Sequence, residues 1–200
     1  MITIGLCGTS GSGKGYVCEK FKEHNIEYID TDKVYSKIAV PESECLKEIC
    51  MFFGDDVLND DGTLNKRRLS SRVFEGENAA QRLKLLNRIT HKYIRDKVEA
   101  TLEKYSKKGI KATIVDAPVL FESGFNELCD VTICVTAPDE LKIERVIKRD
   151  KIPRKKVIAR IESQLPDERL RELCNYEIIN DDYHNLDEQI FDILKKLNLD

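Results

Sequence analysis

Apolar residues form short continuous runs along the chain, separated by stretches in which apolar positions recur every three or four residues. The continuous runs are Ile2–Cys7, Ile26–Ile29, Ala112–Val115, Val131–Val135 and Glu177–Ile179. Nearly continuous Ile, Val and Leu is typical of strands that are covered on both faces, as in a parallel sheet. Because helical patterns separate these runs, the sequence predicts an α/β fold with a five-stranded, mainly parallel sheet.

The second and third runs are separated by about eighty residues, far more than a single crossover helix needs. Helical spacing dominates this interval: it is seen from Leu46 to Phe53, just before Gly54, and again from Leu83 to Tyr105. We therefore predict a helical insertion over about residues 33–109 that binds substrate. The alternative is an insertion with a purely structural role.

Composition and charge argue against binding to nucleic acid or membranes and against a zinc site. The chain is 41% hydrophobic and 34% charged, with a net charge of −3, which gives no general attraction to nucleic acid or to anionic lipid. It lacks an apolar stretch of about 20 residues, the length that spans a bilayer, and no Lys or Arg precedes the first apolar run as in a signal peptide. The 7 dispersed cysteines fit reduced thiols in a cytoplasmic protein, and no zinc spacing is present. No oligomeric state is predicted.

The strongest motif is a glycine-rich loop directly after the first apolar run, Gly8-Thr9-Ser10-Gly11-Ser12-Gly13-Lys14-Gly15. It matches the phosphate-loop pattern G-x-x-x-x-G-K and stands between a predicted strand and a predicted helix. Glycines let backbone N–H groups surround phosphate oxygens, and the lysine follows the charge of the transferred group. We predict that ATP binds to the loop residues Gly8, Gly11, Ser12, Gly13, Lys14, Gly15 and Tyr16. The alternative is an ordinary Gly/Ser turn.

Gly15 departs from the pattern, which has Ser or Thr after the lysine to ligate Mg²⁺. Three outcomes are compatible with a glycine there. Water fills the coordination position, another hydroxyl such as Ser12 or Thr9 substitutes, or metal binding is impaired.

Carboxylates follow two of the predicted strands. Asp30 and Asp32 come after the second run, and Asp116 closes the third in the manner of a Walker-B strand. Ligands of open parallel sheets bind beyond the carboxyl ends of the strands. We therefore predict Asp32 as the carboxylate that orients the acceptor hydroxyl and takes its proton, and Asp116 as the Mg²⁺ carboxylate. The alternative for Asp30 and Asp32 is capping of the next helix.

Basic residues gather late in the chain: Arg145, Lys148, Arg149, Arg154, Lys155, Lys156 and Arg160. Arg145 and Arg149 share a helical face, because they are four residues apart. We predict that they are catalytic, neutralising the transferred phosphoryl group from a lid over about residues 149–172. The alternative is a solvated basic face.

Taken together, these residues resemble the dephospho-coenzyme A kinase family over essentially the whole chain. The most specific stretch is Asp116-Ala117-Pro118-Val119-Leu120-Phe121-Glu122. Others are Ile29-Asp30-Thr31-Asp32, Phe53-Gly54, Asp61-Gly62-Thr63-Leu64, Arg72-Val73-Phe74, Arg145, Arg149-Asp150, Arg160-Ile161 with Gln164, and Ile178-Ile179-Asn180. The chain departs from the family pattern at Gly15-Tyr16, at His91-Lys92 and near Cys174-Asn175.

The resemblance implies a three-layer P-loop fold like that of the nucleoside monophosphate kinases. Its core would span residues 1–32, 110–148 and 173–200, beside the helical insertion and the lid. The implied reaction transfers the ATP γ-phosphoryl group, with Mg²⁺, to the ribose 3′-hydroxyl of dephospho-CoA. By position, Asp32 matches the family's proposed base, and Arg145 and Arg149 match its lid region.

Three other functions compete with this interpretation. The Asp116–Glu122 stretch and the long insertion argue against another small-molecule kinase, such as a nucleoside or shikimate-type kinase. A GTPase would need an Asn/Thr-Lys-x-Asp motif, which is absent. An ATP-binding sensor without catalysis is supported by Gly15 alone, whereas Lys14, Asp32 and Asp116 together favour an active enzyme.

Overall fold

The computed structural model describes residues 1–199 and divides the chain into two compact units. Unit 1 comprises Met1–Asp30 and Leu102–Asp200, and unit 2 comprises Thr31–Thr101. Each unit has its own buried core. The two units are described in turn.

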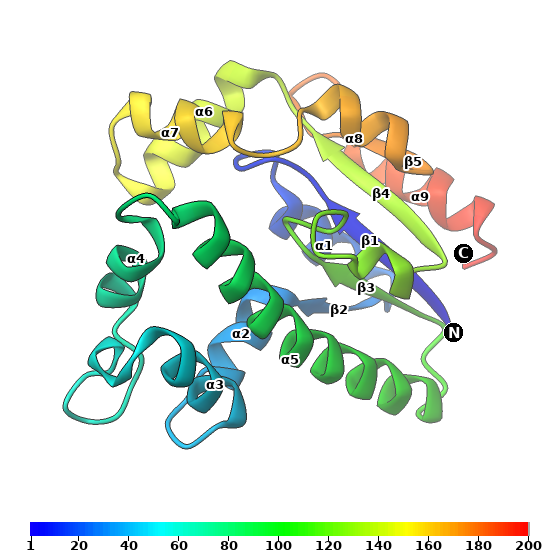
Figure 1. The fold of residues 1–200 in the computed structure, drawn as a ribbon. Coiled ribbons are helices and arrows are strands. Elements are labelled where there is room, and N and C mark those ends of the chain that lie inside the picture. Colours follow the sequence, from blue (N-terminus) through cyan, green and yellow to red (C-terminus); the bar gives the residue numbers. More distant parts are fainter. Residues whose placement is uncertain (200) are drawn as a thin grey trace. The chain divides into compact units, whose positions relative to one another are not determined.

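Unit 1 is built on a five-stranded sheet (Figure 1). Its strands are β1 (Ile2–Cys7), β2 (Glu27–Asp30), β3 (Ala112–Asp116), β4 (Val131–Thr136) and β5 (Tyr176–Ile179), in the order β2-β3-β1-β4-β5. Every neighbouring pair is parallel, so the predicted α/β fold with a parallel sheet is confirmed. β1 has the predicted bounds, and the other four strands differ from the prediction by one residue at one end or at both.

Alternation along β1 separates the two faces of the sheet. Ile4 and Leu6 are fully buried against the helices α1 (Lys14–Glu23) and α9 (Leu186–Lys196), whose residues share one apolar core with them. Gly5 points to the opposite face, where a Cβ would lie 2.8 Å from Leu120 Cδ2. The sheet is therefore covered on both sides, which is why its three central strands, β1, β3 and β4, are almost wholly buried.

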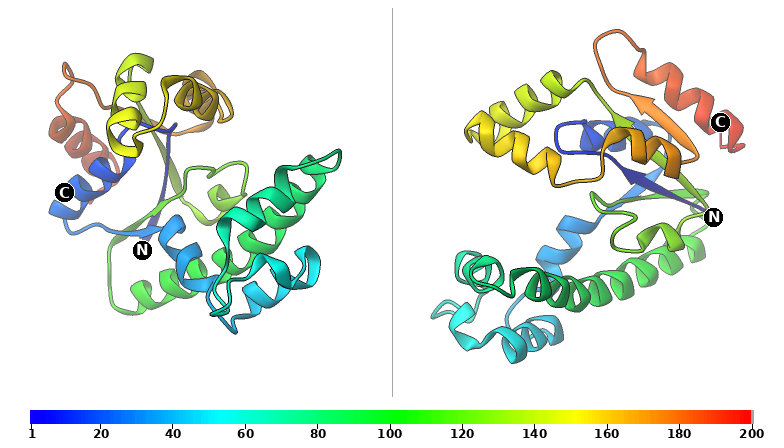
Figure 2. Two further views of the ribbon diagram at one scale, coloured as in Figure 1. Left: turned by 90° about the vertical axis from the view of Figure 1, so that its left-hand side faces the viewer. Right: turned by 45° about the horizontal axis from the view of Figure 1, so that its top comes forward.

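Three helices lie between β4 and β5: α6 (Asp139–Asp150), α7 (Arg154–Glu162) and α8 (Asp167–Leu173). Helix α6 ends at Lys151, which has a left-handed φ of 53°, and Pro153 precedes α7. The views in Figure 2 show α6 and α7 side by side, and they share a small core of Ile143, Val146 and Val157. The segment predicted as a lid, about residues 149–172, therefore contains α7 and α8, and α7 packs against α6, which lies almost entirely before that segment.

Unit 2 is helical and contains α2 (Thr31–Ile38), α3 (Glu44–Phe53), α4 (Lys66–Phe74) and most of α5 (Ala79–Lys107), with a 3₁₀ turn, η1 (Asp55–Val57), after α3. The helical spacing read over Leu46–Phe53 and Leu83–Tyr105 is confirmed by α3 and α5, and Gly54 ends α3 with a φ of 90°. Its core joins α3, α4 and α5 around Ile49, Val73 and Ile89. The functional boundaries of the predicted insertion stay a prediction.

The described residues include no membrane-spanning helix, and the cysteines are not paired in disulfides. Within residues 1–199, no helix combines the length and the apolar character that crossing a bilayer requires. All 7 cysteines are free thiols, and Cys7, Cys18, Cys45 and Cys134 are buried as small apolar side chains.

Candidate active site

The glycine-rich loop connects the carboxyl end of β1 to the first turn of α1 in unit 1. Gly11 and Gly13 adopt left-handed φ values of 88° and 91°. A Cβ at Gly11 would lie 2.3 Å from the Lys142 carbonyl oxygen, and one at Gly13 would lie 2.0 Å from Asn180 Nδ2. Both positions therefore require glycine, for backbone conformation and for space. At Gly15, by contrast, a Cβ would meet nothing within 4 Å.

The polar side chains of the loop suit an anion. Lys14 Nζ donates to the Gly8 carbonyl oxygen at 3.0 Å, so the ammonium is held at the loop. The Ser12 hydroxyl is buried and has no hydrogen-bond partner within residues 1–199. A buried hydroxyl without a partner costs about 1–3 kcal/mol, which a phosphate oxygen would relieve. The Tyr16 side chain that follows is 58% exposed.

Four successive loop residues are fixed by segments that lie far along the chain. Thr9 Oγ1 donates to Asp167 Oδ1 at 3.1 Å, and Ser10 N donates to Gln164 Oε1 at 2.8 Å. The Gly11 carbonyl accepts from Arg145 Nη1 at 3.4 Å, and the Ser12 carbonyl accepts from Asn180 Nδ2 at 2.8 Å. The segment from α6 to the end of β5 therefore sets the loop conformation.

Asp30 and Asp116 end neighbouring strands and are paired in register across β2 and β3. Both influence Cys18 on α1: burial raises the pKa of its thiol, the negative charges of Asp116 and Asp30 raise it further, and Lys14 opposes them. The charges of Lys14, Asp30 and Asp116 therefore all act on Cys18, near the carboxyl ends of β2 and β3. Asp32 is the second residue of α2 and belongs to unit 2, where it is exposed.

Some of the residues at the carboxyl ends of β2 and β3 and in the glycine-rich loop fit an Mg²⁺ ion, and one does not. Carboxylate oxygens such as those of Asp116 and Asp30 are ligands that Mg²⁺ prefers. Gly15 supplies no hydroxyl, although the space that a Cβ would need there is open. The residues thus fit a cation held by the carboxylates, without a ligand from position 15.

The two predicted catalytic arginines have different surroundings. Arg145 is half-buried and donates to the carbonyls of Gly11 and Asn180, the latter at 3.0 Å. Arg149 is exposed and forms two hydrogen bonds with Asp150, at 2.7 and 3.1 Å. Arg160 pairs with the same carboxylate. Only Arg145 of the two contacts the phosphate loop in this structure.

The specific stretch Asp116–Glu122 has a structural component. The Ala117 N–H donates to the Leu6 carbonyl oxygen at 3.1 Å, so pairing with β1 continues one residue beyond the end of β3. Leu120 is fully buried and occupies the space left by the missing Gly5 side chain. Part of the motif therefore anchors this segment to the sheet.

No sequence pattern singles out Lys142 or Asp167, and Asn180 and Gln164 have no role assigned from the sequence. The Lys142 position within the apolar spacing of α6, beside Ile143 and Val146, is the only sequence signal that it is buried. The contacts of these four residues span distances of more than 130 residues along the chain or depend on helix packing, so no local pattern reveals them.

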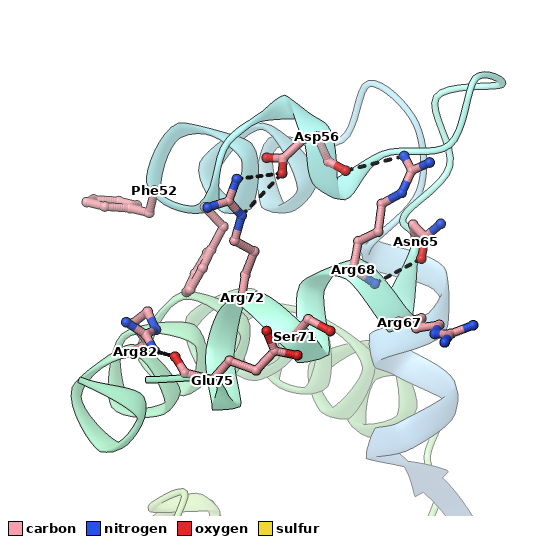
Figure 3. Close-up of a pocket in the computed structure, with 10 residues that line it drawn as sticks. Phe52, Asp56, Asn65, Arg67, Arg68, Ser71, Arg72, Glu75 and Arg82 are labelled. Atoms are coloured by element: carbon pink, nitrogen blue, oxygen red, sulfur yellow. Dashed lines mark hydrogen bonds and ion pairs between the residues drawn. The ribbon is translucent and has the colours of Figure 1, made fainter. Parts of the chain in front are cut away.

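Unit 2 contains a cavity of about 810 Å³ (Figure 3). It is lined by residues of α3, η1, α4 and α5, namely Phe52, Phe53, Asp56, Asn65, Arg67, Arg68, Ser71, Arg72, Glu75 and Arg82. The four guanidinium groups outnumber the two carboxylates, so the lining carries a net charge of +2.

Most of these arginines have structural partners. Arg72 pairs with Asp56 at 2.6 Å, Arg68 donates to the Leu58 carbonyl at 2.7 Å, and Arg82 donates to the Glu75 carbonyl. Bonds to carbonyls orient a guanidinium group without neutralising it. Arg67 has no ion-pair partner within the described part of the chain. The positive charge is therefore available to an anion.

Comparison with known proteins identifies the family. The family model for dephospho-CoA kinase matches residues 2–185. The dephospho-CoA kinase of Lactobacillus johnsonii is 33% identical over 195 residues, which covers 97% of each chain. That of Bacillus anthracis is 34% identical over 200 residues, covering 99% of this chain and 98% of the relative.

Solved structures agree with the fold. A dephospho-CoA kinase from Campylobacter jejuni superposes with a TM-score of 0.69 at 25% identity, over 98% of this chain and 96% of that one. TT1252 from Thermus thermophilus gives a TM-score of 0.80 at 24% identity, over 98% and 97% of the two chains. A shikimate kinase from Bacteroides thetaiotaomicron shares the fold more loosely, with a TM-score of 0.54 at 12% identity over 98% of both chains. With its parallel sheet, its phosphate loop and these matches, the chain belongs to the dephospho-CoA kinase family of ATP-dependent phosphotransferases.

Proposed function

We propose that the chain transfers the γ-phosphoryl group of ATP to the ribose 3′-hydroxyl of dephospho-CoA, the last step of coenzyme A synthesis. The observation that carries this proposal is the phosphate loop, with its two obligatory glycines, its lysine and the buried Ser12 hydroxyl. Family membership supplies the identity of the acceptor. The free thiols of all 7 cysteines support a cytoplasmic setting.

The phosphate loop and the arginines of α6 have different roles in the proposed phosphoryl transfer. The backbone of residues 8–16 binds the phosphates, and Lys14 follows the negative charge during transfer. Arg145 is fixed beside the loop by carbonyl contacts, so its remaining donors can face the phosphoryl group. Arg149 shares a helical face with Arg145 and would join it on exchanging Asp150 for phosphate.

Asp32 is the proposed general base. Phosphorylating an alcohol requires a carboxylate that orients the hydroxyl and accepts its proton late in transfer. Asp32 is an exposed carboxylate that follows the carboxyl end of β2 by two residues. Asp116 would hold Mg²⁺ directly or through water, with Asp30 beside it. The ion, when bound, offsets the negative charge of the transferring phosphoryl group.

The acceptor is proposed to bind in unit 2. Dephospho-CoA carries a diphosphate with two negative charges, which matches the net charge of +2 on the arginine-lined cavity. Phe52 is 49% exposed at this cavity and offers an apolar surface to the organic part of the molecule. Arg67→Ala should raise the KM for dephospho-CoA and leave the KM for ATP unchanged, with Arg88→Ala as a matched control outside the cavity.

The reaction is tested by mixing the protein with ATP, Mg²⁺ and dephospho-CoA and following coenzyme A by mass spectrometry. Asp32→Asn should reduce turnover about a hundredfold or more, the usual loss on removing a general base. Asp96→Asn, an exposed carboxylate elsewhere in unit 2, serves as the control. Gly15→Ser should lower the Mg²⁺ concentration needed for half-maximal rate. A parent chain that binds ATP but makes no product, with or without Gly15→Ser, would establish an ATP-binding sensor instead.

A further inference from the structure

A buried charged cluster lies behind the phosphate loop. Lys142 on α6 is 2% exposed and Asp167 at the start of α8 is 9% exposed. Lys142 Nζ lies 2.9 Å from Asp167 Oδ2 and 2.8 Å from Asp139 Oδ1. Buried ionic groups are costly unless they are paired, and here the lysine is paired with both carboxylates.

The cluster reaches the loop through one side chain. The second oxygen of the same carboxylate, Asp167 Oδ1, accepts a hydrogen bond from Thr9 Oγ1 at 3.1 Å. Thr9 is itself 3% exposed, so water does not compete freely for this contact. A hydrogen bond to a charged acceptor is stronger and more directional than one between neutral groups. One carboxylate thus connects a fixed lysine to the first residue after Gly8.

A second contact to the loop comes from the same segment. Gln164, in the connection between α7 and α8, accepts the Ser10 N–H at 2.8 Å. Lys142 also approaches the loop through its backbone, because its carbonyl oxygen occupies the space that a Cβ on Gly11 would need. Residues 9–11 are therefore held from one side by α6 and by the chain that connects α7 to α8.

We propose that Asp167, held by Lys142, is a positioning residue that keeps the phosphate loop in its nucleotide-binding conformation through Thr9. The pair touches none of the reacting atoms and acts on transfer only by fixing the loop backbone. Gln164 and Asp167 both follow the end of α7, within the segment predicted as a lid, so the same contacts link the loop to that segment. This positioning role goes beyond the proposed reaction, and its binding test does not depend on turnover.

The decisive variants are Thr9→Val and Thr9→Ser. Valine has nearly the shape of threonine but donates no hydrogen bond, and it leaves the Lys142–Asp167 pair intact. Thr9→Val should weaken ATP binding, measured by calorimetry, about tenfold, as expected for losing a hydrogen bond to a charged group. Thr9→Ser, which keeps the hydroxyl, should restore the affinity of the parent. Glu168→Gln, an exposed carboxylate next to Asp167, is the control and should bind like the parent.

Kinetics separate positioning from a merely structural role. Thr9→Val and Asp167→Asn should both raise the KM for ATP and leave the KM for dephospho-CoA unchanged, at temperatures where circular dichroism shows full folding. The proposal is overturned if Thr9→Val binds ATP as the parent does. It is overturned equally if Thr9→Ser is as impaired as Thr9→Val, because the hydrogen bond would then be irrelevant. A parent that binds ATP but makes no coenzyme A would refute the proposed reaction and leave the binding test in force.

Discussion

Two glycines of the phosphate loop, only two residues apart, should respond in opposite ways to the same substitution. Gly13 has a φ of 91°, and an added Cβ would lie 2.0 Å from Asn180 Nδ2, which donates to the Ser12 carbonyl. Gly15 is the second residue of α1 and is exposed, with open space where a Cβ would stand. Alanine should therefore destabilise the protein at the first position and stabilise it at the second.

The magnitudes follow from the separate contributions at each position. Left-handed backbone costs a non-glycine residue about 1–2 kcal/mol, and displacing Asn180 forfeits a hydrogen bond of about 1 kcal/mol. Gly13→Ala should thus lower the free energy of unfolding by about 2–3 kcal/mol, and the melting temperature of a chain of this size by about 5–10 °C. Gly15→Ala should raise the free energy of unfolding by about 0.5–1 kcal/mol, because alanine is the better helix former.

Differential scanning calorimetry of the parent and the two variants measures both effects. Nucleotide should be left out, so that ligand binding does not add to stability. A Gly13→Ala variant as stable as the parent would show that the loop does not hold the left-handed conformation. A destabilised Gly15→Ala variant would show that the space beside Gly15 is filled.

Two further predictions concern other parts of unit 1. Leu120→Ala should lower the free energy of unfolding by about 3 kcal/mol in urea titrations, because the side chain is fully buried against Gly5; an unchanged midpoint would contradict that packing. Hydrogen bonds from Arg149 and Arg160 lower the pKa of the Asp150 carboxyl from 3.8 to about 2. Its stabilising contribution is therefore complete above about pH 4 and lost as the pH falls towards 2. An NMR titration of Asp150 with a midpoint near 3.8 would disprove these ion pairs in solution.

Much of the fold is readable from local patterns. Continuous apolar runs predict the five strands because a strand covered on both faces needs apolar side chains at every position. β2 ends at Asp30, one residue beyond the predicted end, because its backbone still pairs with β3 there. Backbone pairing cannot be read from the pattern of apolar side chains. Helices α3 and α5 were predictable for the corresponding reason, since burying one face of a helix imposes a period of 3.6 residues.

The parts of the candidate site that consist of consecutive residues could be predicted from the sequence. The glycine-rich loop can be found because phosphate binding, close backbone approach and the turn into a helix all act on eight consecutive residues. Arg145 and Arg149 could not be distinguished, because equal spacing on one helix says nothing of what each guanidinium meets. In the structure Arg145 meets the carbonyls of the loop and Asn180, whereas Arg149 meets Asp150.

The strands, the main helices and the phosphate loop can be predicted from the sequence, because each depends on residues that are neighbours along the chain. The strand order β2-β3-β1-β4-β5, which brings Asp30 opposite Asp116, is a result of tertiary packing. Tertiary packing likewise buries Lys142 against Asp167, 25 residues away. Such contacts form only when distant segments pack together, and the free energy that selects them comes from burial and pairing rather than from local propensity.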